Sequence, residues 1–201
     1  MRNKEKKGFT LVELLISMVI VAILVGIASP NFGSLMLDNH LASKYNAAAR
    51  ALLVARSEAV KVAGKVVICA RGADNATCSD NWSMGWLVFH DAPPTNSGTP
   101  TSIAGIGAED TVLLQQSDRA AAISISAYGS LSGFPSENIN WIRYQGDGST
   151  NLDTASVLLC DSRAEEYARV LNIQITGDFR AGRKHSSSGI ALDTYNEAVT
   201  C

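Results

Sequence analysis

The chain has 201 residues, 46% of them hydrophobic, and a formal net charge of −2 at pH 7. This length is sufficient for a globular domain with a buried core. The charge balance argues against a protein that binds nucleic acid in bulk, because such proteins are usually basic. Any contact with nucleic acid would therefore depend on a local basic patch.

The N-terminus consists of a charged leader followed by an apolar run. Residues 1–8 carry four Lys or Arg residues against one Glu, and the polar members of residues 9–28 are Thr10, Glu13 and Ser17. A helix of about twenty residues, at ~1.5 Å per residue, matches a hydrocarbon core of roughly 30 Å. The pattern predicts a membrane anchor. A secretory signal peptide is the alternative, because Gly26-Ile27-Ala28-Ser29 offers a small-residue cleavage site.

Glu13 argues against an ordinary anchor or signal peptide. A charged side chain inside a spanning segment costs roughly 2.5–3.5 kcal/mol, so it should have a role or a partner. Cleavage between Gly8 and Phe9 would create a cationic amine one helical turn before Glu13. That amine, or the amine of a neighbouring subunit, can pair with the carboxylate. Removal of residues 1–8 would also leave thirteen Lys and Arg against eighteen Asp and Glu, a formal charge of −5.

The stretch from Gly8 to Glu13, Gly-Phe-Thr-Leu-Val-Glu, resembles the class III signal of type IV pilins and pseudopilins. In those proteins a prepilin peptidase cuts after the glycine and methylates the new amine. The resemblance implies cleavage between Gly8 and Phe9, N-methylation of Phe9, and Glu13 as the carboxylate used in assembly. It also implies a single-pass protein of the bacterial inner membrane with a periplasmic globular domain, which later moves to an extracellular pilus.

The apolar pattern predicts that this helix continues past Pro30 to about residue 63. Pro30 either kinks the helix or lets it restart, because proline breaks an interior hydrogen bond. From residue 35 onward apolar residues recur at helical spacing with charged residues off the stripe. Gly64 is a natural stop. We therefore expect one long helix, apolar over 9–28 and amphipathic over 29–63, whose second half needs a cover.

The remainder, residues 64–201, is predicted to be a β-rich globular domain. Residues 91–108, rich in Pro, Gly, Thr and Ser, predict a long loop, and residues 144–149 predict a hairpin turn rather than a calcium loop. The expected fold class is α+β, with antiparallel β-sheets packed on the C-terminal half of the helix. The predicted strands are 65–69, 87–89, 111–116, 122–127, 139–144, 156–160 and 168–176.

Four cysteines, Cys69, Cys78, Cys160 and Cys201, suit an oxidising compartment and two disulfides. None forms a Cys-x-x-Cys pair and the histidines lie far from them in sequence, so neither a metal nor a cofactor is predicted. Three pairings are open. We favour Cys69–Cys78, which closes a short turn-rich loop, and Cys160–Cys201, which ties down the last residue of the sequence.

A basic segment at residues 177–185 is the candidate binding site. Arg180, Arg183 and Lys184 lie there between glycines and a serine run, and such side chains suit sequence-independent contacts to phosphate. The alternative is a solvated loop. No nucleophile elbow, phosphate loop or paired helical histidine occurs in the sequence, so an enzyme is not predicted.

The globular part resembles the minor pilins of the FimU/FimT type, in the GspH/FimT pseudopilin family. The resemblance is carried by Trp82 to Asp91, by the Cys69–Cys78 loop, and by Leu159-Cys160-Asp161 leading into residues 168–170. It implies a helical spine capped by two β-sheets.

DNA-binding members of that family carry Gly-Arg-x-Arg near the position of Gly182. Here Gly182-Arg183-Lys184-His185 has a histidine in place of the second arginine. Because histidine is mostly neutral at physiological pH, this departure weakens the DNA-binding interpretation.

The resemblance implies a minor pilin that joins a type IV pilus or its tip-priming complex and supports pilus assembly. Its partners would be other major and minor pilins, the prepilin peptidase and the inner membrane, with DNA as a further partner if it serves DNA uptake. The sequence leaves three alternatives open: a DNA-binding minor pilin for natural transformation, a GspH-like pseudopilin of a type II secretion system, and a tethered periplasmic protein whose anchor is never cut.

Overall fold

The computed structural model describes residues 8–91, 110–117, 123–131 and 137–201, without the side chains of residues 27–31, 131 and 137. The chain divides into two compact units, Met1–His40 and Leu41–Cys201. The predicted loop at 91–108 lies outside the described residues apart from Asp91, which ends a strand.

Helix α1 (Leu11–Val62) is continuous through Pro30 and belongs to both units. It ends one residue before the predicted limit, and Gly64 does not supply the left-handed conformation that often ends a helix. Ala63 does so instead, with φ of 48°, and the Gly64 amide donates to the Ala59 carbonyl at 3.1 Å. A Cβ at Gly64 would lie 2.8 Å from Nε2 of His90, so a larger residue there would displace that imidazole.

The described part of the first unit is an apolar helix whose side chains are not packed against any other described segment. Its large apolar side chains from Phe9 to Val25 are all more than half exposed, with Phe9 at 83%. A helix that is hydrophobic on every side is normally buried against protein or lipid. This surface therefore has to be covered by other molecules.

No helix among the described residues is long and apolar enough to cross a membrane.

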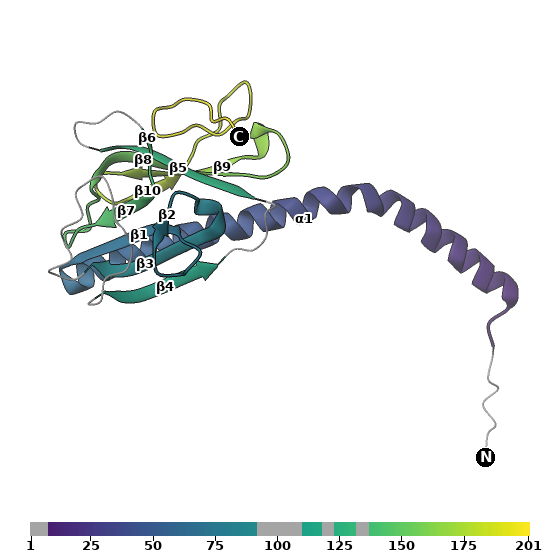
Figure 1. The fold of residues 1–201 in the computed structure, drawn as a ribbon. Helices are drawn as coiled ribbons and strands as arrows, with labels where there is room; N and C mark the ends of the chain where they lie inside the picture. Colours follow the sequence, from purple (N-terminus) through teal and green to yellow (C-terminus); the bar gives the residue numbers. More distant parts are fainter. Residues whose placement is uncertain (1–7, 92–109, 118–122, 132–136) are drawn as a thin grey trace, which may run out of the picture. The chain divides into compact units, whose positions relative to one another are not determined.

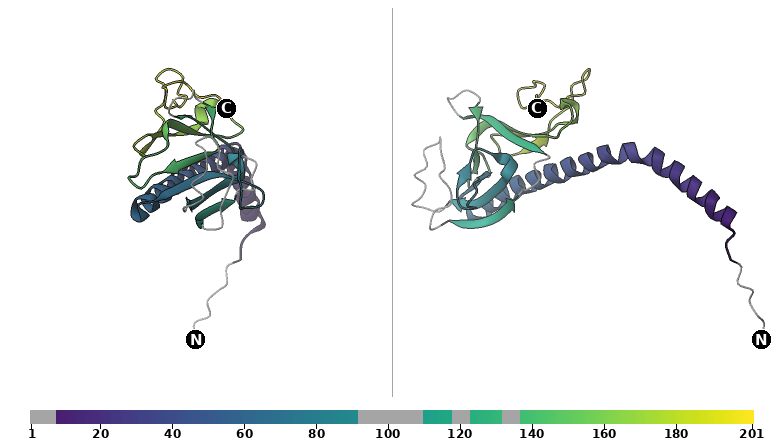
Figure 2. Two further views of the ribbon diagram at one scale, coloured as in Figure 1. Left: turned by 60° about the vertical axis from the view of Figure 1, so that its left-hand side comes forward. Right: turned by 45° about the vertical axis from the view of Figure 1, so that its right-hand side comes forward.

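The second unit contains two antiparallel sheets, which the ribbon views show alongside the C-terminal half of α1 (Figure 1; Figure 2). This arrangement confirms the predicted α+β class. The first sheet has the order β2-β1-β3-β4, with β7 also paired to β1: β1 (Lys65–Arg71), β2 (Cys78–Ser79), β3 (Gly85–Asp91), β4 (Thr111–Ser117) and β7 (Trp141–Tyr144). The second has the order β10-β9-β8-β5-β6: β5 (Ser124–Leu131), β6 (Glu137–Asn138), β8 (Leu152–Cys160), β9 (Arg169–Gln174) and β10 (Phe179–Ala181). Two 3₁₀ helices complete the unit: η1 (Trp82–Met84) and η2 (Glu165–Tyr167).

The core of the second unit lies between α1 and the inner faces of both sheets. The buried face of α1 consists of Leu41, Ala48, Ala51, Leu52, Ala55 and Ala59, and it packs with alternate residues of β1, β3, β5, β8 and β9. The small alanines allow the strands to approach the helix closely. Among the described residues, every buried one lies at or after Leu41. The second unit thus carries its own core and can fold without residues 1–40.

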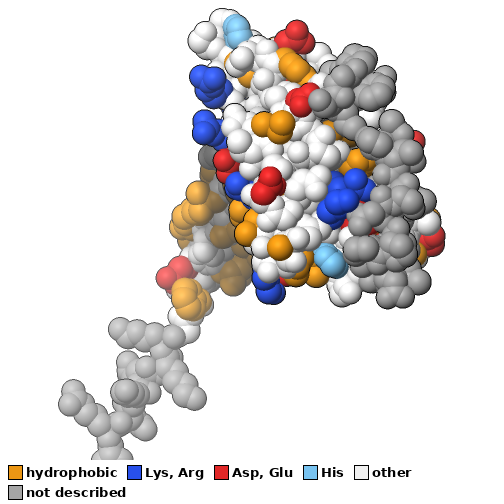
Figure 3. Space-filling model, turned by 90° about the vertical axis from the view of Figure 1, so that its left-hand side faces the viewer, with side chains coloured by type: hydrophobic (Ala, Val, Ile, Leu, Met, Phe, Trp, Pro, Cys, Tyr) orange, Lys and Arg blue, Asp and Glu red, His pale blue; other side chains and the backbone are white. Residues whose placement is uncertain are grey.

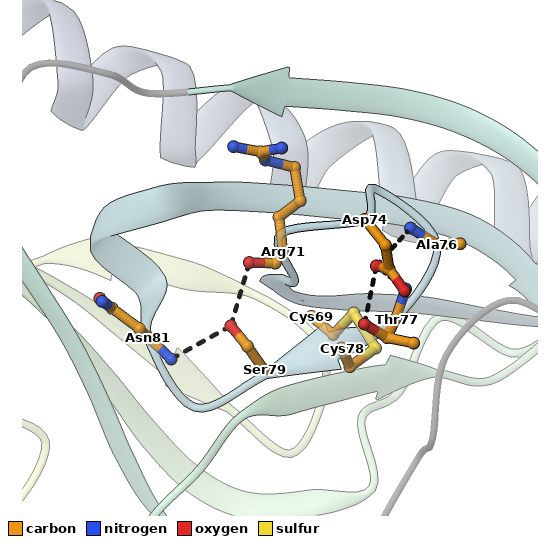
Figure 4. The surroundings of a disulfide bond; sticks show 8 residues. All are labelled: Cys69, Arg71, Asp74, Ala76, Thr77, Cys78, Ser79 and Asn81. Atoms are coloured by element: carbon orange, nitrogen blue, oxygen red, sulfur yellow. Dashed lines mark hydrogen bonds between the residues drawn. A yellow bond between two sulfur atoms is a disulfide. The ribbon is translucent and has the colours of Figure 1, made fainter.

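Both disulfides form in the pairing that the sequence analysis favoured. Cys69–Cys78 joins β1 to β2, and Cys160–Cys201 joins β8 to the segment after β10. Each is expected to stabilise the fold by roughly 2–4 kcal/mol. The loop closed by the first bridge is ordered by Asp74, whose Oδ1 accepts hydrogen bonds from the amides of Ala76 and Thr77 (Figure 4). These bonds to the ionised form lower the pKa of Asp74.

Arg56 of α1 connects the helix to two turns of the second unit. Its Nε donates to the Gly148 carbonyl at 3.2 Å, and its Nη2 donates to the Thr176 carbonyl at 3.0 Å. Its Nη1 pairs with Oδ1 of Asp178 at 2.5 Å, and this contact lowers the pKa of that carboxyl. The ion pair therefore contributes above the ordinary pKa of aspartate and is lost as the pH falls through the lowered value.

Candidate functional site

The N-terminal motif leads directly into a capped helix. Thr10 is the N-cap of α1, because its Oγ1 accepts a hydrogen bond from the Glu13 amide at 3.2 Å and its carbonyl accepts from the Leu14 amide at 3.2 Å. The helix therefore starts at Leu11, two residues later than predicted. Thr10-Leu11-Val12-Glu13 has the Ser/Thr-x-x-Glu spacing of a capping box, and this signal could have identified Thr10 from the sequence.

Glu13 lies in the first turn of α1 with its carboxylate free of hydrogen bonds to any described residue. The positive end of the helix dipole favours a carboxylate at this place. Phe9 and Gly8 are both exposed, and a Cβ built on Gly8 would meet nothing within 4 Å. The two residues that flank the predicted cleavage bond are thus exposed, and the amine of Phe9 would lie four residues before Glu13.

The basic segment near the end of the chain divides into two parts. Arg180 lies on β10 opposite Asn172 of β9, and it shares the lining of a polar hollow of about 510 Å³ with Arg183. Lys184 is not part of this lining, and its Nζ donates to the Glu166 carbonyl at 2.9 Å. The structure thus brings two of the three predicted cations together and directs the third elsewhere. The other lining residues are Asn172, Gln174, Ala181, Leu192, Asp193, Thr194 and Asn196.

A hydrogen-bond network holds the wall of this hollow. Ser156 donates to Oδ1 of Asn172 at 2.9 Å, and Nδ2 of Asn172 donates to the Leu192 carbonyl at 3.1 Å. The Thr194 amide donates in turn to Oγ of Ser156 at 3.0 Å. These bonds fix residues 192–194 against the outer face of the second sheet, so the hollow is a built feature of the fold.

The two arginines are available for an anion. Neither guanidinium donates a hydrogen bond to a described residue. Asp193 offsets part of their charge, although its Oδ1 already accepts hydrogen bonds from the amides of Tyr195 and Glu197, at 2.8 and 2.9 Å. The hollow is therefore weakly positive and lined by amides and hydroxyls.

His185 is exposed beyond the hollow, in a turn where its Nδ1 lies 3.0 Å from Oγ of Ser187. On the face drawn in Figure 3, Lys and Arg side chains form separate groups with Asp and Glu among them. That face therefore does not carry a continuous basic surface of the kind that gives strong, salt-sensitive binding to nucleic acid.

Within the described part of the chain, His, Cys, Asp and Glu side chains do not gather in threes as potential metal ligands.

Two family models match this chain. Residues 45–177 match the family model described as "Type II transport protein GspH", and residues 3–29 match the prokaryotic N-terminal methylation motif. No curated protein sequence matches the chain. The GspH match ends before Arg180, so it covers Asn172 and Gln174 of the hollow but neither of its arginines.

Two crystal structures of the type IV minor pilin FimU of Pseudomonas aeruginosa strain PAO1 are similar to this chain. The form in space group P21 has 19% sequence identity and a TM-score of 0.50, covering 72% of this chain and 90% of that chain. The form in space group P65 has 15% identity and a TM-score of 0.41, covering 74% and 91%. At this identity the first of them shows the fold alone.

Proposed function

The chain belongs to the GspH family of type II transport proteins, and from this premise we infer that it is a minor pilin built into a type IV pilus or its tip-priming complex. Members with this N-terminal motif are minor pilins or pseudopilins. The observation that carries the proposal is the methylation motif at residues 3–29, which includes the exposed apolar stretch 11–25 of α1 with its one carboxylate, Glu13.

The proposed sequence of events follows from the chemistry of that segment. A prepilin peptidase cuts between Gly8 and Phe9 and methylates the Phe9 amine. Residues 9–28 hold the subunit in the inner membrane until it is extracted, and its apolar surface then packs against the helices of neighbouring pilins. In that dry bundle Glu13 pairs with the amine of a neighbour and sets the axial register, because an unpaired buried charge is costly.

Mass spectrometry of the N-terminus tests this proposal. Protein from cells that assemble pili should begin with N-methyl-Phe9, and a Gly8→Val variant should retain Met1. The substitution removes the glycine that the peptidase requires, while nothing lies within 4 Å of a Cβ at that position. An intact Met1 in the unaltered protein would contradict the proposal and favour an uncut tethered protein.

A pseudopilin of a type II secretion system has the same subunit chemistry, so the filament that contains the protein decides between the two. We expect the protein in sheared pili of wild-type cells and its loss from that fraction when the major pilin is deleted. If the protein instead remains in the sheared fraction without the major pilin, and cells that lack the protein fail to secrete type II substrates, the protein belongs to the secretion system.

DNA capture is a second candidate function, favoured by the two arginines that share the polar hollow. Arg180 and Arg183 both line this hollow, and neither guanidinium donates a hydrogen bond to a described residue, so both can contact phosphates. Lys184 is directed to the Glu166 carbonyl and should contribute less.

Titration with duplex DNA at several salt concentrations tests this candidate on the fragment Asp38–Cys201, which holds every buried residue that the structure describes. If the arginines bind DNA, Arg180→Ala/Arg183→Ala should reduce the salt slope by about 2, since each lost phosphate contact contributes roughly 0.9. Arg50→Ala, which removes an exposed arginine of α1, is the control and should leave binding unchanged. Equal losses in both variants, or no binding at low salt, would remove the DNA role.

A further inference from the structure

The C-terminal segment (residues 183–201, yellow in Figure 1) follows β10 and folds back over the second sheet. Among the described residues, each of its backbone-to-backbone hydrogen bonds stays within the segment, for example from Leu192 to Arg183 at 2.6 Å and from Val199 to Ala191 at 3.1 Å. Its isolated β-bridges are internal as well. The segment is therefore a small folded unit that lies on the sheet and is not a strand of it.

The attachment of the C-terminal segment to the sheet is mostly through side chains. Besides the hydrogen bonds that hold the wall of the polar hollow, the Tyr128 hydroxyl donates to Oδ2 of Asp193 at 3.3 Å. Ala191 and Val199 are the buried apolar side chains of the segment. They form a cluster, separate from the main core, with Leu158, Cys160, Ala168 and Val170. A segment with so few buried apolar contacts opens more easily than the core does.

The Cys160–Cys201 bridge is the covalent attachment of the segment. Cys160, at the end of β8, is 4% exposed, whereas Cys201 is exposed. The two cysteines are 41 residues apart in sequence, and the entropy that a disulfide removes from the open chain grows with the length of the closed loop. The bridge therefore contributes more to holding the segment down than any one of its side-chain hydrogen bonds.

The polar hollow depends on this attachment. More than half of the residues that line the hollow belong to the C-terminal segment: Arg183, Leu192, Asp193, Thr194 and Asn196. Arg180 belongs to β10 instead, where pairing with β9 holds its backbone. The docked segment therefore brings the two arginines into the lining of one hollow, and an open segment would separate them.

We propose that the Cys160–Cys201 bridge is a redox-sensitive latch, whose reduction releases residues 183–201 from the second sheet and takes the polar hollow apart. A thiolate of a dithiol reductant attacks Sγ of Cys201, the S–S bond breaks, and Cys160 leaves as a thiolate and takes up a proton. The second thiol of the reductant then displaces Cys201 from the mixed disulfide, so two cysteines are reduced while one dithiol is oxidised. The effect on anion binding rests on the DNA capture proposed above, but the release of the segment does not.

Hydrogen exchange of the fragment Asp38–Cys201 tests the latch. The variant Cys69→Ala/Cys78→Ala keeps Cys160–Cys201 as its one bridge, so its oxidised and dithiothreitol-reduced samples differ at the latch alone. On reduction, the hydrogen-bonded amides of residues 192–199 should lose protection at least about thirtyfold relative to the amides of β8 and β9. An equal loss in both sets would show that the bridge stabilises the whole domain, and no loss would show that the segment holds itself. Either result would overturn the proposal.

The complementary variant Cys160→Ala/Cys201→Ala keeps the other bridge and is the matched control. Its segment amides should already exchange rapidly, and dithiothreitol should accelerate them no further. A reductant effect in this variant as large as in the first would assign the release to the wrong bridge and overturn the proposal. Protected amides in β8 and β9 show that each variant is folded.

Titration with inorganic phosphate measures the consequence for the polar hollow. The oxidised fragment should bind phosphate at least tenfold more tightly than the reduced one, and Arg180→Ala/Arg183→Ala should abolish binding in the oxidised state. If the segment is released on reduction but neither state binds phosphate, the latch is supported and the anion-binding role of the hollow is refuted.

Discussion

Glu13→Ala is expected to remove the protein from assembled pili while leaving its folding unchanged. In the proposed bundle the substitution leaves the amine of a neighbouring subunit buried without a partner. Breaking a buried pair in this way costs roughly 3–5 kcal/mol, and 1.4 kcal/mol corresponds to about tenfold in an equilibrium constant. Incorporation should therefore fall by at least about a hundredfold, measured by immunoblot of sheared pili relative to whole cells.

Two controls make that result specific. Ser17→Ala removes another polar side chain of the same apolar segment, but the Ser17 hydroxyl already donates to the Leu14 carbonyl at 2.8 Å, so incorporation should stay within about twofold. Mass spectrometry should show N-methyl-Phe9 in both variants, which separates assembly from processing. Normal incorporation of processed Glu13→Ala would refute the proposed pairing.

Gly177→Ala is expected to cause the largest loss of stability of any glycine-to-alanine change at the described glycines. Gly177 has φ of 77°, and a Cβ there would lie 1.9 Å from the Gly148 carbonyl oxygen. That oxygen also accepts the hydrogen bond from Arg56, so moving it disturbs the contact between helix and turns. We expect a loss of about 3 kcal/mol or more, which corresponds to roughly 6–12 °C in melting temperature.

Gly189→Ala separates the two causes of this effect. Gly189 has a similar φ of 70°, but a Cβ there would meet nothing within 4 Å. Its substitution should therefore cost only the left-handed conformation, about 1–2 kcal/mol. Thermal unfolding of the fragment Asp38–Cys201, followed by circular dichroism, gives both values. Equal losses in the two variants would show that the approach of Gly148 to Gly177 contributes nothing.

The parts of this fold that the sequence predicts are those whose signal is local. Helical spacing of apolar residues predicts α1, and runs of β-branched residues predict the central strands. The motif from Gly8 to Glu13 is linear and could be recognised directly. Strands β2, β6 and β10 were missed, because two or three residues carry no period and these strands exist through their pairing with β1, β5 and β9. Strand β5 extends beyond its predicted end at residue 127 to Leu131, because residues 128–131 also pair with β8. Gly129 fits that pairing, since a Cβ there would lie 2.7 Å from the Thr154 carbonyl oxygen.

The geometry of the basic segment could not be predicted from its spacing. Arg180 and Arg183 share a hollow because β10 pairs with β9 and because residues 192–194 fold back over the same sheet. Lys184 follows Arg183 in sequence but is directed to a different loop. Arg56 was also missed as a structural residue, since its three partners lie in turns far along the chain.

The alanines on the buried face of α1 have a consequence for the gene. Ala51, Ala55 and Ala59 are fully buried and Ala48 nearly so, with both sheets against them. A single C-to-T change in any alanine codon gives valine, which adds two methyl groups where there is no room and costs about 1–3 kcal/mol. Leu53 and Val60, on the exposed side of the same helix, tolerate far more codon changes. After random mutagenesis of this helix, functional variants should therefore carry substitutions at exposed positions, which recur about every 3.6 residues. Almost none should carry a substitution at the four alanines.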